Sequence, residues 1–339
     1  MTRSDKPEAL VVMGRDTFEL QFDQVRLARL RELTNLGDPV WADEMDSAAV
    51  RERATDVEIL ITSWGCPRLD EARLALLPRL TAVFHCAGSV RSLVSEGLWR
   101  RGIAVTNAAD GNAIPVAEYT LAAITFAGKQ APFLAADART HREDWSYISR
   151  RGDLSNYGRT VGIVGFSRVG RLVVGRMRDL ETAECLVSDP YADAVAVKDL
   201  GARLVPLDEM LPLVDILSLH APQLPQTDKM IGAAELAMLH DKATVINTAR
   251  GSLMDTAALE RECASGRLSA ILDVTDPEPL PASSVLYSLP NVMLTPHIAG
   301  SLGTETHRMT NSALDEVQRY VDGLPPTKAV TSEELGVSA

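Results

Sequence analysis

The chain of 339 residues is short of aromatic residues, of cysteines and of positive charge. Aromatic side chains make up 5% of it, and 34 lysines and arginines stand against 46 aspartates and glutamates, which gives a formal net charge of −12. A negative total charge argues against a nucleic-acid partner, because binding to a polyanion depends on neutralising its phosphates. The longest apolar stretches, such as residues 121–127, are far shorter than the roughly 20 residues that cross a bilayer. We therefore expect neither a nucleic acid nor a membrane as partner.

Metal and disulfide chemistry lack their usual patterns. The four cysteines (Cys66, Cys86, Cys185 and Cys263) are scattered without a CxxC pair. No cluster of His, Asp or Glu has the spacing of metal ligands, so no metal is predicted. The first eight residues are polar and charged, which differs from an apolar signal segment. A cytoplasmic location is the default expectation.

What the chain does contain is typical of a two-domain α/β protein. Hydrophobic residues make up 46% and charged residues 24%, and the length exceeds one ordinary hydrophobic core. Short apolar runs alternate with amphipathic helical stretches such as residues 25–36, and this alternation predicts parallel βαβ units. The runs in the first part of the chain are residues 9–13, 58–62, 81–84 and 103–106. Longer helices are expected at 113–129 and 304–322, and the polar tail 327–339 is expected to be disordered.

A dinucleotide-binding pattern begins near residue 159. The apolar run 159–164 predicts a strand, the turn Gly165-Phe166-Ser167-Arg168-Val169-Gly170 follows, and residues 171–180 continue with helical periodicity. Such a turn directs the N-terminus of a helix at a pyrophosphate. Asp189 comes 19 residues after Gly170, at the end of the next apolar run. An acid there accepts a hydrogen bond from the ribose 2′-hydroxyl of NAD and repels the 2′-phosphate of NADP. The pattern therefore predicts NAD as the cofactor.

Three polar residues follow later apolar runs and have complementary chemistry. Arg250, Glu278 and His297 each lie at or just beyond a predicted parallel strand, where open α/β sheets bind ligands. Arginine binds a carboxylate with a planar fork, and histidine moves a proton near neutral pH. A carboxylate beside the histidine orients its ring. Together with a hydride donor, this set reduces a 2-oxo acid.

The order and spacing of these motifs resemble the D-isomer-specific 2-hydroxyacid dehydrogenases. The resemblance covers about residues 59–323. It is carried by Val161-Gly162-Ile163-Val164-Gly165, Ser188-Asp189-Pro190-Tyr191, Leu219-His220-Ala221-Pro222, Ile246-Asn247-Thr248-Ala249-Arg250-Gly251, Leu272-Asp273-Val274 and Thr295-Pro296-His297-Ile298. It implies two Rossmann-like domains. A flavodoxin-like substrate domain (1–110, completed by 301–326) would hold an inserted NAD-binding domain (111–300) built on a doubly wound parallel sheet.

The resemblance also implies residue roles. Arg250 would bind the substrate carboxylate and carbonyl, His297 would be the acid/base and Glu278 its partner, where the related formate dehydrogenases carry Gln. Asp273 would hold the nicotinamide carboxamide. The implied cofactor set is Gly165, Ser167, Arg168, Val169, Gly170, Asp189, His220, Ala221, Pro222, Thr227, Thr248, Ala249, Arg250, Asp273, His297, Ala299 and Gly300.

Substrate contacts are expected from two loops of the first domain. In the family, the backbone N–H groups of the loop that here holds Ala87, Gly88 and Ser89 bind the substrate carboxylate. Trp64 either forms a wall for the substrate's R-group or anchors a surface loop. The family resemblance further predicts a homodimer through the helix at 113–129, whose apolar surface would include Leu121, Ile124 and Phe126.

Two questions stay open on the sequence. Ser167 replaces the second glycine of the fingerprint, and its hydroxyl can donate to a phosphate oxygen. The alternatives are a tolerated variant with slightly weaker cofactor binding, an altered cofactor pose, or a lost cofactor site in a retired enzyme. The alternative function is that of an NAD(H)-sensing binding protein, like the co-repressors that resemble these dehydrogenases. The identity of the R-group is not specified by these motifs.

Overall fold

The computed structural model describes residues 6–336, which separate into two compact units. Unit 1 comprises residues up to 112 together with 301–336, and unit 2 comprises residues 113–300. Each unit is built on one sheet in which every strand pair is parallel. The predicted α/β class with two parallel sheets is therefore confirmed.

The sheet of unit 1 has the strand order β2-β1-β3-β4-β5. This is the flavodoxin-like order, in which the chain winds to both sides of its first strand. The strands are β1 (Glu8–Val12), β2 (Asn35–Ala42), β3 (Ile59–Thr62), β4 (Ala82–His85) and β5 (Ala104–Thr106). The three central strands, β1, β3 and β4, are short runs buried on both faces, as expected for strands covered by helices.

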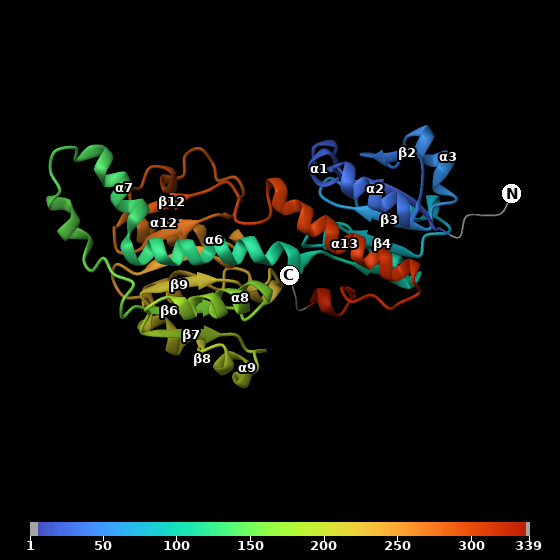
Figure 1. Ribbon diagram of the computed structural model, residues 1–339. Helices are drawn as coiled ribbons and strands as arrows, with labels where there is room; N and C mark the ends of the chain where they lie inside the picture. Colours follow the sequence, from blue (N-terminus) through green and yellow to red (C-terminus); the bar gives the residue numbers. More distant parts are fainter. Residues whose placement is uncertain (1–5, 337–339) are drawn as a thin grey trace. The chain divides into compact units, whose positions relative to one another are not determined.

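Six helices accompany this sheet within unit 1 as the structure describes it. They are α1 (Arg15–Gln21), α2 (Gln24–Leu33), α3 (Ala48–Ala54), α4 (Glu71–Leu76), α5 (Glu96–Arg100) and α13 (Thr306–Val321). α13 comes from the far end of the chain and packs against α2 and β4 (Figure 1). It buries Leu314 and Val317 in the same apolar cluster as Phe84 of β4.

Strand β2 was not predicted from the sequence. Its segment contains Gly37 and Pro39, two residues that disfavour the interior of a sheet. Here β2 is an edge strand, where proline is tolerated, and its pairing with β1 shifts register between Ala9 and Val11. Most of its side chains are only partly buried, so it lacks the apolar run on which the prediction of the other strands depended.

The expectation that the tail 327–339 is disordered is wrong for residues 327–336. Ala329 forms an antiparallel bridge with Thr106, and the Val330 amide donates to the carbonyl of Val105 at 2.8 Å. Thr327 donates through its amide and its hydroxyl to the buried carboxylate of Glu316. The side chains of this tail are polar and mostly exposed, whereas its backbone pairs with the free edge of β5. Residues 337–339 lie outside the described part of the chain.

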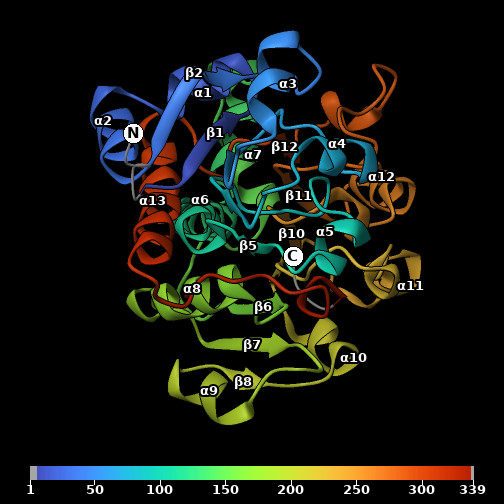
Figure 2. The same ribbon diagram turned by 90° about the vertical axis from the view of Figure 1, so that its right-hand side faces the viewer.

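The sheet of unit 2 has seven strands in the order β12-β11-β10-β9-β6-β7-β8 (Figure 2). From β6 the chain moves outward through β7 and β8 and then crosses to β9 on the other side. This reversal makes the gap between β6 and β9 a topological switch point, where such sheets bind ligands. The strands are β6 (Thr160–Val164), β7 (Glu184–Ser188), β8 (Arg203–Leu204), β9 (Ile216–Leu219), β10 (Thr244–Asn247), β11 (Ser269–Leu272) and β12 (Val292–Leu294).

Helices connect these strands within unit 2. They are α7 (Ala131–Thr140), α8 (Arg168–Arg176), α9 (Ala194–Asp199), α10 (Leu207–Met210), α11 (Ala233–Met238) and α12 (Thr256–Ala264). The segment between α7 and β6 contains one 3-10 helix (Ser146–Arg151). Helix α6 (Ala109–Lys129) starts in unit 1 and runs on into unit 2.

The apolar surface expected on α6 is smaller than predicted. Ile124 is completely buried in the core of its own unit, in one cluster with Val161 and Ile163 of β6, so its assignment to an exposed face is wrong. Leu121 is partly buried against the same cluster. Of the three residues named from the sequence, Phe126 alone remains well exposed, at 51%. Helical periodicity located the apolar face, but it did not reveal that the chain's own sheet covers that face.

Candidate active site

The parallel register of unit 2 brings the polar residues that follow its strands to one edge of the sheet. Leu219 is paired with both Val164 and Asn247, and Leu272 with both Asn247 and Leu294. The carboxyl ends of five neighbouring strands are therefore level. The residues that follow them are Gly165 after β6, His220 after β9, Arg250 beyond β10, Asp273 after β11 and His297 beyond β12.

Two glycines of the fingerprint are required by close backbone contacts. Gly165 has a φ of 97°, and a Cβ there would lie 2.5 Å from the backbone nitrogen of Ala221. A Cβ on Gly170 would lie 2.1 Å from the carbonyl oxygen of Gly165. Both positions exclude any side chain. Together they let the start of α8 approach the end of β6 closely, which is the geometry that exposes helix N–H groups to a phosphate.

Ser167 occupies its position without strain. Its φ of −72° and ψ of −174° are ordinary extended values, so this turn does not need a glycine there. The Ser167 hydroxyl caps α8 by accepting a hydrogen bond from the amide of Gly170 at 3.4 Å. Since the hydroxyl acts as acceptor in this bond, its own hydrogen can still be donated to an anion at the helix N-terminus.

Asp189 is fixed beside the fingerprint at the end of β7. One carboxylate oxygen accepts from the amide of Phe166 at 2.7 Å, and the other accepts from the amide of Tyr191 at 2.8 Å. The first of these bonds ties the carboxylate to the fingerprint turn itself. The acid predicted from spacing to face the ribose therefore also braces the turn that would hold the pyrophosphate.

The loops after β9 and β10 are held by hydroxyl groups. Thr227 donates to the carbonyl of Pro222 at 2.6 Å and accepts from the amide of Leu224 at 2.9 Å. The buried hydroxyl of Thr248 lies 2.8 Å from that of Thr120 on α6. Thr227, Pro222 and Thr248 were assigned to the cofactor from the sequence; in the structure their side chains and carbonyls also fix the two loops.

His220 is excluded as a proton donor by its surroundings. The ring is buried, and its Nε2 lies 2.9 Å from the hydroxyl of Ser218. Burial penalises the charged ring and lowers the pKa of His220 to about 3. The ring is therefore neutral near pH 7.

The loop that carries Arg250 is pinned by its neighbours. The side chain of Asn247 accepts from the amide of Ala249 at 3.0 Å and donates to the carbonyl of Arg250 at 2.9 Å. A Cβ on Gly251 would lie 2.0 Å from the carbonyl carbon of Thr275, so glycine is required there as well. Asn247 was not among the residues predicted from the sequence, although its side chain closes this turn in the manner usual for Asn.

His297 and Glu278 form the predicted pair. Nδ1 of His297 lies 2.9 Å from Oε1 of Glu278, and both side chains are about half exposed. Because Nδ1 faces a carboxylate, it carries a hydrogen, and Nε2 is the nitrogen left to exchange a proton with another molecule. The backbone of His297 has a φ of 55°, in the left-handed region that is uncommon for residues other than glycine.

Asp273 holds the turn in which His297 lies. Its buried carboxylate accepts three hydrogen bonds, from the Thr295 hydroxyl at 2.7 Å and from the amides of Ile298 and Ala299 at 2.8 Å each. Its carbonyl accepts from the amide of His297 at 2.9 Å. The family resemblance implies that Asp273 would hold the nicotinamide carboxamide. The bonds observed here show a structural role that no local pattern indicated, because they join segments more than 20 residues apart.

In unit 1, the loop after β4 presents unused backbone donors. The amides of Ala87, Gly88 and Ser89 make no hydrogen bond with the described part of the chain. The loop itself is fixed, because the carbonyl of Cys86 accepts from the Gln21 side chain at 3.1 Å and the carbonyl of Ala87 accepts from a backbone amide at 3.0 Å. Successive free amides on a fixed loop suit a carboxylate.

His85 comes just before this loop. The ring is buried at the end of β4, with Nδ1 2.9 Å from the hydroxyl of Thr62 on β3. Burial lowers the pKa of His85 to about 4, so the ring is neutral near pH 7. It links the strand ends from which both predicted substrate loops start. Trp64, on the other of these loops, is 41% exposed and fills no core position in unit 1.

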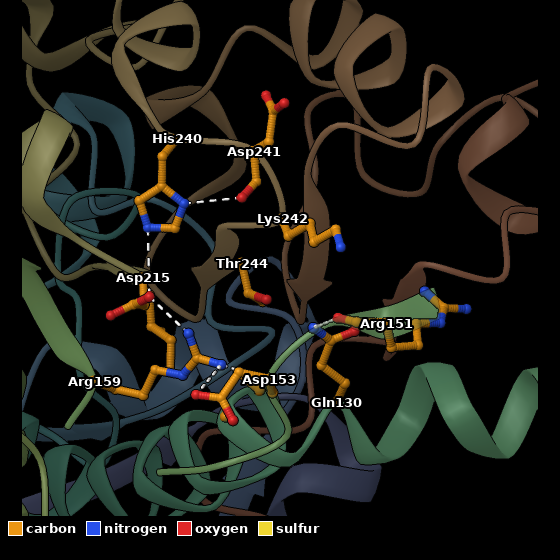
Figure 3. Close-up of a pocket in the computed structure, with 12 residues that line it drawn as sticks. Gln130, Arg151, Asp153, Arg159, Asp215, His240, Asp241, Lys242 and Thr244 are labelled. Carbon is orange, nitrogen blue, oxygen red and sulfur yellow. Dashed lines mark hydrogen bonds and ion pairs between the residues drawn. The ribbon is translucent and has the colours of Figure 1, made fainter. Parts of the chain in front are cut away.

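A cavity of about 110 Å³ lies at the opposite edge of the sheet of unit 2, where β9 and β10 begin (Figure 3). Several of its charged groups form ion pairs. Arg159 and Asp215 are 2.8 Å apart, and His240 lies 3.5 Å from the same carboxylate. Arg151 is paired with Asp137 at 2.6 Å. This cavity is remote from the strand ends that carry the predicted catalytic residues, and we assign its charges to holding the loops together.

Neither a metal centre nor a membrane span is found in residues 6–336. Over this range no group of three or more His, Cys, Asp or Glu side chains is placed to hold a metal ion. None of the helices described is both long enough and apolar enough to cross a membrane.

Comparison with known proteins identifies the family. Residues 128–299 match the family model described as "D-isomer specific 2-hydroxyacid dehydrogenase, NAD binding domain". The chain belongs to this family. The match confirms the resemblance stated from the sequence motifs and the predicted binding domain for NAD.

Relatives with assigned names cover most of the chain. It is 31% identical over 292 residues to the D-3-phosphoglycerate dehydrogenase of Mycobacterium tuberculosis, a match that spans 85% of this chain and 54% of the relative. The chain thus spans about half the length of the phosphoglycerate dehydrogenases that it matches. A glyoxylate reductase of Korarchaeum cryptofilum is 29% identical over 304 residues, with 88% of this chain and 90% of the relative covered.

Solved structures show the same fold. A protein of Thermus thermophilus aligns with a TM-score of 0.76 at 28% identity, over 95% of this chain and 100% of that one. A phosphoglycerate oxidoreductase from Rhizobium etli aligns with a TM-score of 0.81 at 22% identity, over 97% of this chain and 100% of that one. At this identity the second likeness concerns the fold alone.

The position of Asp189 predicts which dinucleotide is preferred. The wild-type protein is expected to bind NADH more tightly than NADPH, because the carboxylate repels a 2′-phosphate. Asp189→Ala should bring the dissociation constants of NADH and NADPH closer together, as measured by titration of cofactor fluorescence. Asp193→Ala, which removes the cap of α9 in the same unit, is the matched control and should leave the ratio unchanged. A wild-type preference for NADPH would contradict the assignment.

Proposed function

We propose that the protein is an NAD-dependent dehydrogenase that interconverts a 2-oxo acid and a D-2-hydroxy acid. The observation that carries the proposal is the His297–Glu278 pair, 2.9 Å apart, on the strand edge that also carries Arg250 and the dinucleotide fingerprint. The names of the relatives, phosphoglycerate dehydrogenase and glyoxylate reductase, support this class of reaction.

We propose that unit 2, within the predicted bounds 111–300, binds the dinucleotide. The close backbone contacts at Gly165 and Gly170 bring the start of α8 against the end of β6, and a pyrophosphate would bind to the N–H groups at that helix end. Arg168, Val169 and the Ser167 hydroxyl would line that end of the helix, and Asp189 would bind the ribose. The remaining proposed contacts are His220, Ala221, Pro222, Thr227, Thr248, Ala249, Asp273, Ala299 and Gly300.

Unit 1, with predicted bounds 1–110 and 301–326, would contribute to substrate binding. The amides of Ala87, Gly88 and Ser89 would hold the substrate carboxylate together with Arg250. Trp64 has the exposure that a contact with the R-group requires, and it stays a proposed contact. Fixing the carboxylate at two points orients the carbonyl group, and such orientation contributes a large part of the rate enhancement of bimolecular reactions.

The proton chemistry follows from the His297 ring. Bound NADH supplies the hydride, and the protein supplies orientation and charge. As negative charge grows on the carbonyl oxygen, the guanidinium of Arg250 stabilises it, and Nε2 of protonated His297 donates a proton to it. In the oxidative direction neutral Nε2 accepts the hydroxyl proton. Glu278, on the other ring nitrogen, stabilises the imidazolium and keeps Nε2 pointing outward.

Turnover is the direct test of this proposal. NADH oxidation, followed by absorbance, should be detected with at least one member of a panel that includes glyoxylate, hydroxypyruvate and bulkier 2-oxo acids. His297→Asn should abolish it while NADH still binds. Tight NADH binding without turnover of any acid would instead favour the alternative, an NAD(H)-sensing binding protein.

Arg250 is expected to act through bidentate hydrogen bonds from its planar guanidinium and not only through its charge. Arg250→Lys keeps the charge but loses bidentate binding, so kcat/KM should fall by about 10²-fold or more. The matched control is Arg203→Lys, an exposed arginine of unit 2 that pairs with Glu184, and it should leave the kinetics unchanged. Wild-type kinetics in Arg250→Lys would rule out the role assigned to this residue.

We further propose a homodimer, as in the family. Phe126 on α6 is 51% exposed and Trp145 in the following segment is 75% exposed, so both side chains are accessible to a second copy of the chain. Sedimentation equilibrium should give about twice the chain mass of 36.7 kDa, and Phe126→Glu with Trp145→Glu should lower it. A single-chain mass at micromolar concentration would contradict the proposal.

A further inference from the structure

A chain of hydroxyl groups connects α6 with the turn that carries His297. The hydroxyl of Tyr119 lies 2.8 Å from that of Thr295, and the Thr295 hydroxyl lies 2.7 Å from Oδ1 of Asp273. A threonine hydroxyl has a single hydrogen, and here it is donated to the carboxylate. Tyr119 must therefore be the donor to Thr295, and the chain has one direction: Tyr119 to Thr295 to Asp273.

The surroundings of Tyr119 keep it a donor. The residue is half-buried, and burial is the main cause that raises the pKa of its phenol. The negative charge of Asp273 acts in the same sense, and together they outweigh the bond to Thr295, which acts in the opposite one. The Tyr119 hydroxyl can thus supply its hydrogen to Thr295 throughout the pH range in which the protein would work.

The end of the chain is the carboxylate that shapes the His297 turn. The Asp273 carboxylate accepts hydrogen bonds from the amides of Ile298 and Ala299, and these bonds hold the backbone directly C-terminal to His297. His297 itself has a φ of 55°, a conformation that costs on the order of 1–3 kcal/mol when a residue other than glycine adopts it. The direction of its imidazole therefore depends on how firmly the Asp273 carboxylate is held.

We propose that Tyr119 and Thr295 are positioning residues for His297. They fix the Asp273 carboxylate by donating to it in series, and the carboxylate fixes the turn from residue 295 to residue 299. The proposal rests on the proposed function of His297 as acid/base. Both residues act through Asp273, and neither was among the site residues predicted from the sequence.

The test uses two variants that remove single hydroxyl groups. Small misplacements of a catalytic group cost up to about 10²-fold in rate, so Thr295→Val, which removes the donor to Asp273 itself, should lower kcat by roughly 10- to 100-fold. Tyr119→Phe removes only the outer donor and should lower kcat less, by roughly 3- to 10-fold. In both variants the KM of the 2-oxo acid should stay close to that of the wild type. Thr295→Ser should restore most of kcat because it keeps the hydroxyl.

Unit 1 offers a matched control. The hydroxyl of Tyr320 on α13 lies 2.6 Å from that of Thr81, so Tyr320→Phe breaks a bond of the same type away from the His297 turn. It should change thermal stability about as much as Tyr119→Phe and leave kcat unchanged. If Tyr119→Phe and Thr295→Val also leave kcat unchanged in an active enzyme, the two residues are purely structural and the proposal is overturned.

A second measurement separates this proposal from the proposed function. The backbone amide and ring resonances of His297 are recorded by NMR in the wild type and in the Tyr119, Thr295 and Tyr320 variants. They should shift in the first two variants and stay in place in Tyr320→Phe. Absence of turnover in the wild type, with shifted His297 resonances in the variants, would contradict the function but support the positioning role. Unshifted resonances would contradict the positioning role whatever the activity.

Discussion

The level carboxyl ends of the strands in unit 2 are the constraint on which the candidate site depends. Leu219, Asn247, Leu272 and Leu294 are linked pairwise across four strands, so the residues that follow them start from the same edge of the sheet. The side chains of these strands alternate between two apolar cores, so a strand shifted by one residue would exchange the side chains that fit each core and disrupt the packing of both. The hydrophobic core therefore enforces the alignment of the polar residues, although none of those residues belongs to the core.

The turns at this edge are fixed in two different ways. Gly165 and Gly251 use the absence of a side chain, because each packs so closely against backbone that a Cβ would collide with it. The third turn must carry an imidazole, so glycine cannot serve, and His297 takes a left-handed conformation instead. Three hydrogen bonds to the Asp273 carboxylate offset that cost, since a hydrogen bond to a charged group contributes about 1.5–3 kcal/mol. The buried carboxylate of Asp273 thus fixes the turn at His297, as the absence of a Cβ fixes the turns at Gly165 and Gly251.

Patterns local in sequence were enough to predict the parts of the molecule that depend on local chemistry. The buried strands and the fingerprint follow from apolar runs and from the residues that end them, and the pairing of Glu278 with His297 was implied by the family resemblance. Strand β2 was missed because an edge strand needs no apolar run, and the tail was missed because its backbone, not its side chains, pairs with β5. The link from Tyr119 to Asp273 spans more than 150 residues, and no spacing rule predicts a bond between side chains so far apart.

Three histidines at strand ends show how burial separates similar sequence contexts. His85 and His220 both follow or end apolar runs, as His297 does, but their rings are buried and their pKa values fall to about 4 and about 3. A proton donor changes its charge in every turnover, so it cannot lie where one charge state is strongly penalised. His297 differs from both, because its ring is half-exposed and its Nδ1 lies 2.9 Å from Oε1 of Glu278. The contacts available to orient this ring are therefore the Glu278 carboxylate at one ring nitrogen and the backbone turn that Asp273 holds.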